Sequence, residues 1–89
     1  MPPRPWLLSP HQTHSLAFKL KILRLSRGYT QRDLGRAARL PQSSVSAFEG
    51  GLTPNADQLR RLATALGVSV TALQRLPVEA LVGGGGHAA

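Results

Sequence analysis

The segment from Tyr29 to Gly51 constrains the fold of this chain more than any other part of the sequence. Its pattern predicts two short helices, over about 31–38 and 42–49, with only Arg39-Leu40-Pro41 between them. Thr30 is a residue type that caps helix N-termini, and the glycine pair at 50–51 ends the second helix. The segment therefore predicts a pair of helices joined by a sharp corner.

The apolar residues of this pair are spaced for burial on a shared side. Leu34 and Ala38 lie one turn apart on the first helix, and Val45 and Phe48 lie three residues apart on the second. Gly35 is small enough for the two helices to cross at close range. This arrangement is typical of a helix-turn-helix, in which the second helix enters the major groove of DNA.

From about residue 16 to 76 the chain resembles the Xre family of small DNA-binding domains, the phage repressor and Cro type. The matching residues are Arg24, Gly28, Thr30-Gln31, Leu34-Gly35, Ala38, Leu40, Ser44-Val45-Ser46, Glu49, Gly51, Pro54, Leu59, Leu62-Ala63, Leu66-Gly67-Val68-Ser69 and Leu73. The resemblance implies an all-α fold, a compact five-helix domain like the DNA-binding domain of lambda repressor. Arg39 departs from the family, which usually has glycine at this left-handed turn position, and a side chain there costs roughly 1 kcal/mol.

Capping residues and glycines mark the ends of further helices in the rest of the chain. We expect further helices over about 15–27, 56–66 and 70–76, and no strands. The predicted organisation is a proline-rich N-terminal arm over 1–14, a helix-turn-helix domain over 15–76, and a C-terminal extension with a glycine-rich tail over 77–89. Within that extension, Pro77 interrupts the last helix and residues 78–82 add a turn or two.

The charge and composition of the chain limit the kinds of molecule that it is expected to bind. Lys and Arg number 11 against four acids, a net charge of +7, and no acid lies between Leu34 and Phe48. Beside a helix-turn-helix, this excess is the expected electrostatic footprint of a nucleic-acid-binding protein. The chain has no cysteine, which suits a reducing cytoplasm, and no apolar run near the roughly 20 residues of a membrane span. We expect a cytoplasmic protein that binds double-stranded DNA and no membrane.

The resemblance assigns the base contacts to the second motif helix, at Gln42, Ser43, Ser46 and Ala47. The amide of Gln42 can pair with adenine N6 and N7, and the methyl group of Ala47 suits a thymine methyl. The two serines read bases ambiguously and have an ordinary alternative in backbone hydrogen bonding.

Phosphate contacts are expected at the start of the first motif helix. Gln31 lies where the helix dipole and free N–H groups attract an anion. The resemblance implies that Gln31 also braces the recognition residue. Further candidates, each with a capping, loop or solvated-charge alternative, are Thr30, Arg32, Thr53, Asn55, Lys19 and Lys21. For Arg24 and Glu49 the resemblance implies a partly buried, structural ion pair rather than a contact with DNA.

The first helix is apolar on two sides. Leu16, Leu20 and Leu23 form one stripe, and a second stripe of Phe18, Ile22 and Leu25 lies roughly 180° away at 100° per residue. A helix of this kind must be covered on both sides. The candidate covers are the N-terminal Trp6-Leu7-Leu8 or a second chain, and an alternative dimer surface lies on the last helix around Leu73 and Leu76.

These features favour a sequence-specific transcriptional regulator, a repressor that binds a palindromic operator as a homodimer, because one helix reads only a few base pairs. The alternative is a protein-interaction module, antitoxin-like or polymerase-associated, that docks a partner protein through the second stripe and the N-terminal arm. We expect no enzyme activity, cofactor or metal site, since His11 and His14 lack a third ligand nearby and His87 lies in the glycine tail.

Overall fold

The structure is a computed structural model that describes residues 15–84. The N-terminal arm with Trp6 and its neighbours, the three histidines, and the glycine-rich tail beyond Gly84 lie outside the described residues. The predictions that concern them therefore stay predictions.

The described chain is entirely helical, as the sequence predicts, and residues 15–84 contain no strand. Its helices are α2 (Leu16–Ser26), α3 (Gln31–Ala38), α4 (Gln42–Glu49), α5 (Ala56–Leu66), α6 (Val70–Arg75) and α7 (Val78–Gly84). The five helices predicted for the domain are confirmed as α2 to α6. Leu76 takes up extended backbone and ends α6, and the turn or two expected after Pro77 forms a sixth helix, α7, of seven residues.

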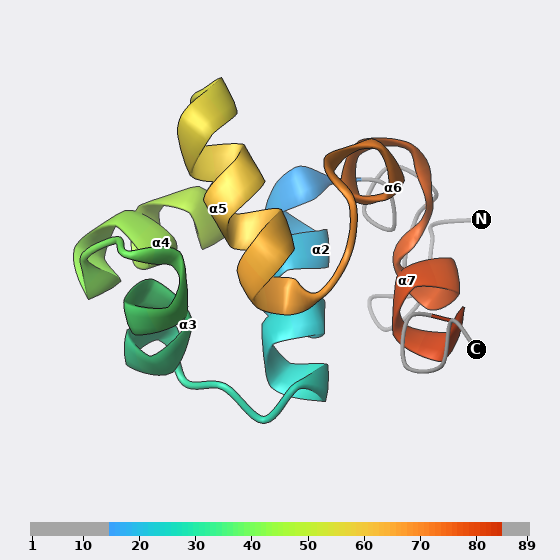
Figure 1. Cartoon of the computed structure of the whole chain (residues 1–89), viewed down its shortest axis with the longest axis horizontal. Coiled ribbons are helices and arrows are strands. Elements are labelled where there is room, and N and C mark those ends of the chain that lie inside the picture. The colour runs from blue at the N-terminus through green and yellow to red at the C-terminus, as the bar shows by residue number, and fades with distance from the viewer. Residues whose placement is uncertain (1–14, 85–89) are drawn as a thin grey trace, which may run out of the picture.

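Figure 1 shows α3 and α4 at one end of the molecule and α6 and α7 at the other, with α2 and α5 between them. α3 packs against both α4 and α5, while α2 packs against α4, α6 and α7. α2 is thus the central element that joins the helix-turn-helix to the C-terminal pair.

Side-chain caps fix where the helices begin. The side chains of Ser15, Thr30 and Ser69 accept hydrogen bonds from backbone N–H groups of α2, α3 and α6, and the predicted N-cap at Thr30 is thereby confirmed. At the start of α3 the bond is reciprocal, since the Asp33 carboxylate accepts from the Thr30 N–H at 2.9 Å. Asn55 and Gln58 form the same capping box on α5.

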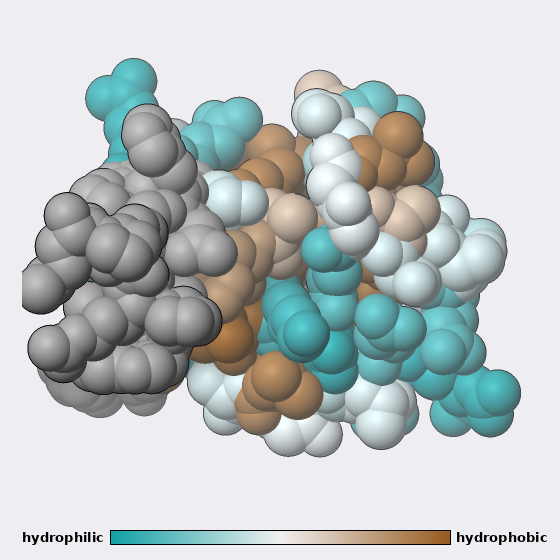
Figure 2. All heavy atoms as spheres, turned by 180° about the vertical axis from the view of Figure 1, so that it is seen from behind, coloured by the Kyte–Doolittle hydropathy of each residue, from teal (hydrophilic) through white to brown (hydrophobic). Residues whose placement is uncertain are grey.

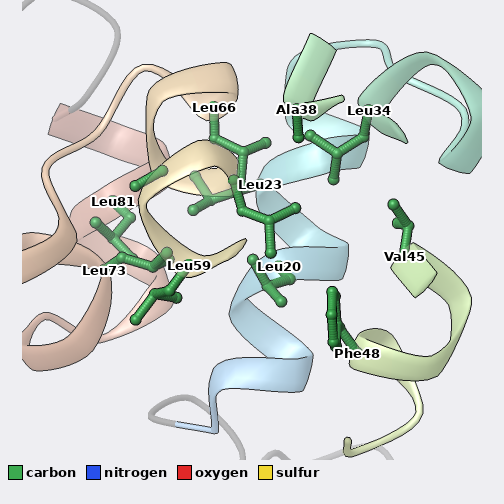
Figure 3. Packing of buried hydrophobic residues seen from close by; sticks show 12 residues of the cluster. Leu20, Leu23, Leu34, Ala38, Val45, Phe48, Leu59, Leu66, Leu73 and Leu81 are labelled. Atoms are coloured by element: carbon green, nitrogen blue, oxygen red, sulfur yellow. The ribbon is translucent and has the colours of Figure 1, made fainter. Parts of the chain in front are cut away.

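The core is a single apolar cluster around α2 (Figure 3). Leu20 and Leu23 lie between the side chains of α3 and α4 on one side and those of α5, α6 and α7 on the other. Leu34, Val45 and Phe48 are buried in it and fix the helix-turn-helix against α2. Each such side chain contributes roughly 1.5–3 kcal/mol on burial.

Lys19 is buried in this fold, contrary to its prediction as a phosphate contact. Its side chain is 1% exposed, and its Nζ donates to the backbone oxygens of Gln74 at 3.3 Å and Leu76 at 3.2 Å. These carbonyls belong to the C-terminal end of α6, where the helix leaves acceptors without internal partners. Burial lowers the pKa of the Lys19 ammonium from its ordinary value. Lys19 therefore holds α6 to α2.

One prediction about interface residues needs correction, because Leu73 is fully buried in the core cluster and offers no surface to a second chain. Leu25 is 53% exposed, while Phe18 and Ile22 are half-buried, so the interface on the second stripe of α2 stays a prediction. Leu76 is exposed, as a residue of the alternative dimer surface must be.

Candidate nucleic-acid interface

The corner between α3 and α4 is built on close backbone contacts. Arg39 takes the left-handed conformation, φ 59° and ψ 45°, which confirms the prediction for this position. The next residue, Leu40, donates its N–H to the Gly35 carbonyl at 2.7 Å. A Cβ atom on Gly35 would lie 2.6 Å from the Leu40 oxygen, so only glycine lets the chain turn here. The corner fixes where α4 begins.

α4 has a buried side and an exposed side. Val45 and Phe48 enter the core. Of the predicted base-contact residues, Gln42, Ser43 and Ser46 are exposed and Ala47 is half-buried. Their spacing of one and four residues places all of them on the outer face of one helix. The structure thus brings these residues together on one surface.

A buried ion pair locks the far end of α4 to α2. The Arg24 Nε lies 2.6 Å from Glu49 Oε2, with both side chains almost fully buried. The same guanidinium also donates from Nη2 to Glu49 Oε1 at 3.1 Å and from Nη1 to the Tyr29 carbonyl at 2.9 Å. The positive charge of Arg24 is therefore paired inside the fold.

Gln31 extends this network. Its Nε2 donates to Glu49 Oε1 at 3.1 Å, so its amide braces the end of α4, whereas the family resemblance implied a brace on a recognition residue. Gln31 itself is half-buried at the first residue of α3. A single glutamate thus connects α2, the start of α3 and the end of α4.

The other phosphate candidates divide into two kinds. The side chains of Thr30 and Asn55 are engaged as helix caps. Arg32 and Thr53 are exposed. The start of α3 also carries a negative charge, since the backbone N–H of Thr30, and then its hydroxyl, lower the pKa of the Asp33 carboxyl. The Asp33 carboxylate thus offsets the attraction of the helix dipole for an anion at the start of α3.

Internal bonds remove several cations from the surface charge. Lys19 and Arg24 are buried, and Arg27 donates from Nε to the Leu66 carbonyl at 3.0 Å, at the end of α5. Figure 2 shows hydrophilic residues over the lower part of the end away from the grey residues, whereas apolar residues lie in its upper part and in the middle of that face. Three of the 11 Lys and Arg residues are thus engaged inside the fold.

Sequence reasoning missed the partners of Lys19 and of Arg61. Lys19 lies four residues before Leu23, at the edge of the core stripe of α2. This spacing is the sequence pattern from which its burial could have been predicted. The Arg61 guanidinium donates to the backbone oxygen of Arg39 at 3.3 Å. No sequence pattern indicates that contact, because it joins α5 to a corner more than twenty residues earlier.

None of the helices in the described part of the chain has the length and apolarity needed to cross a membrane. Among curated proteins, no significant match is found.

Two comparisons agree with the geometry of the corner and α4. A solved structure, the hypothetical transcription factor NHTF from Neisseria, matches with a TM-score of 0.69 and 28% identity over 88% of this chain and 90% of that one. The family described as helix-turn-helix domain matches residues 15–76, which include the whole motif and the helices that support it. The chain therefore belongs to the helix-turn-helix domain family.

Proposed function

We propose that this protein is a transcriptional regulator of the Xre type that binds double-stranded DNA in a sequence-specific way. The observation that carries the proposal is the outer face of α4, where Gln42, Ser43 and Ser46 are exposed together while Val45 and Phe48 anchor the helix from behind. The matched Neisseria structure, described as a hypothetical transcription factor, supports the same activity.

In this proposal α4 enters the major groove and α3 crosses the DNA backbone. Gln42, at the first position of α4, reads an adenine through its amide, and Ala47 contacts a thymine methyl. Ser43 and Ser46 add hydrogen bonds, while Gln31, Thr30, Arg32, Thr53 and Asn55 lie near phosphates. None of the four base-reading residues is an arginine, so guanine contributes little to direct readout.

The protein acts in this proposal as a homodimer on a palindromic operator and represses transcription in the cytoplasm. A single α4 reads only a few base pairs, so two copies are needed for useful specificity. Leu76 and Val82 are exposed near the C-terminal end of the described chain and are candidates for the dimer contact.

Selection of bound sequences from random duplex DNA tests the proposal. A symmetric consensus with adenine at the position facing Gln42 is the expected result. Enrichment of no sequence, at low salt and with folded protein, would refute sequence-specific binding.

A second candidate function, a protein-docking module, is favoured by the exposure of Leu25 beside the half-buried Phe18 and Ile22 on α2. This surface does not overlap the outer face of α4. A Leu25→Ser variant that selects the same DNA consensus as the wild-type chain, and differs only in protein association, would separate this second function from the first.

A further inference from the structure

The exposed cations of the described chain gather on one part of its surface. Within residues 15–84 the exposed cations are Lys21, Arg32, Arg36, Arg39, Arg60, Arg61 and Arg75. Five of these seven come from α3, the corner and α5. We call this set, Arg32, Arg36, Arg39, Arg60 and Arg61, the arginine strip.

Backbone and side-chain contacts connect the members of the strip. Arg32 and Arg36 lie one turn apart on α3, and Arg36 accepts the Arg39 N–H on its carbonyl at 3.2 Å. Arg61 donates to the Arg39 carbonyl, which links α5 to the corner. α3 and α5 also pack directly against each other, as Figure 1 shows. The strip is therefore continuous from α3 across the corner to α5.

Few negative charges lie near the arginine strip. Asp57 binds both Arg60 and Arg61, the latter at 2.7 Å. Asp33 is held by Thr30 in the α3 capping box. Five guanidinium groups thus lie near only two carboxylates, so the strip is a net positive surface that attracts an anionic partner.

Arg39 adds an independent observation. It is the one residue other than glycine with positive φ among residues 15–84, in a conformation that glycine adopts without strain. An arginine in this conformation has a strained backbone, a feature that is more common at functional sites than elsewhere.

We propose that the arginine strip binds the phosphates of one DNA strand, extending the backbone contact of α3 across the corner and onto α5. Arg39 comes three residues before Gln42, where α4 begins. A helix that enters a groove about 12 Å wide brings the residues just before its first turn close to the phosphates at the groove edge. This inference rests on the proposed DNA binding, and besides Arg32 it assigns to DNA arginines that were not among the phosphate candidates of the sequence.

The test is the salt dependence of DNA affinity, measured by fluorescence anisotropy on the selected site and on a random duplex. Each lost phosphate contact lowers the slope of log affinity against log salt by about 0.9. Arg39→Gly and Arg61→Gln should therefore each match the wild-type chain at 1 M salt and bind about eightfold more weakly at 0.1 M. The loss should be the same on both duplexes, since phosphates carry no sequence information.

Two further variants control the experiment. Arg75→Gln removes an exposed cation of α6, outside the strip, and should keep the wild-type slope. Asp57→Asn removes the carboxylate that binds two strip arginines, so it should raise affinity at low salt, a gain that misfolding cannot produce. The Arg39→Gly variant should melt no lower than the wild-type chain, because glycine relieves the left-handed backbone.

Wild-type slopes in both Arg39→Gly and Arg61→Gln would overturn the inference and leave the strip as a surface for an acidic protein. That result is distinct from failure of the proposed function, in which the wild-type chain itself selects no DNA sequence.

Discussion

At the scale of single residues, the outer face of α4 is the surface that we propose reads the bases of DNA. Gln42 is exposed at the first position of α4, which starts after Pro41 without a side-chain cap. Its amide therefore has no competing partner in the helix cap. The residues behind it are apolar and buried, so substitutions on this face should alter DNA binding with little effect on folding.

Gln42→Ala should weaken binding to the selected site by roughly 1–3 kcal/mol and relax the preference at a single base pair, because a bidentate amide contact with adenine is lost. Arg32→Ala serves as the comparison, since loss of a phosphate contact should lower affinity on every sequence alike. Competition binding with single-base variants of the site measures both. An equal loss for Gln42→Ala on specific and random DNA would show that Gln42 reads no base.

Asp33 should make the stability of the fold depend on pH in the acidic range. The Thr30 N–H, followed by the Thr30 hydroxyl, lowers the pKa of Asp33 from its ordinary 3.8, so the ionised carboxylate is favoured in the folded state. The stabilisation is then fully present above about pH 3.8 and is lost as the pH falls through the lower folded value.

Thermal melting of the wild-type chain and Asp33→Asn across this range checks that prediction. The difference in Tm should be largest near neutral pH and shrink below the ordinary pKa. Thr30→Val keeps the backbone N–H, the larger cause of the shift, and should retain most of the pH dependence. A Tm difference that stays constant with pH would contradict the assignment.

At the scale of helices, polar contacts from α2 set the position of its neighbours. Arg24 reaches Glu49 at the end of α4 and the Tyr29 carbonyl before α3. Lys19 reaches the end of α6. α2 therefore positions both the helix-turn-helix and the C-terminal helices through buried cations as well as through leucines.

Arg24→Met should destabilise the fold by roughly 3–5 kcal/mol, because it leaves the buried Glu49 carboxylate without its cation. The double variant Arg24→Met/Glu49→Met should cost less than Arg24→Met alone, since neither charge then remains buried. Urea unfolding of the wild-type chain, both single variants and the double variant gives the coupling energy. Additive costs would mean that the pair contributes little to holding α4 on α2.

At the scale of the whole molecule, the C-terminal extension belongs to the core. Leu81 on α7 is 2% exposed and joins the same cluster as Leu20 and Leu73. α7 lies beyond residue 76, where the match to the helix-turn-helix family ends. α7 thus lies outside the matched segment, yet it packs against α2 and helps to cover it.

Leu81→Ala should destabilise the fold by roughly 2–5 kcal/mol through the cavity it leaves. The neighbouring Val82, which is exposed, provides the matched control, and Val82→Ala should change stability by no more than about 0.5 kcal/mol. Chemical denaturation of both variants measures the contrast. Equal small effects would mean that α7 is not part of the folding unit.

The sequence by itself determined the helices of the motif. Thr30 and the glycines at the helix ends have local chemical roles, and the spacing of Leu34, Ala38, Val45 and Phe48 follows from the geometry of one helix turn. Such features depend on neighbours within a few residues, so they can be read directly from the chain. The left-handed Arg39 could be predicted for the same reason, with the help of the family resemblance.

Only the tertiary structure decided which polar groups meet across the fold. By residue type alone, Lys19 and Arg61 look like any surface cation. In the fold, however, Lys19 is buried against α6, and Arg61 donates a hydrogen bond to the Arg39 carbonyl. The burial of Leu73 and Leu81 likewise depends on how α6 and α7 return to α2. A side chain's final partner is set by the packing of distant helices, and local periodicity fixes the face of a helix but not what lies against it.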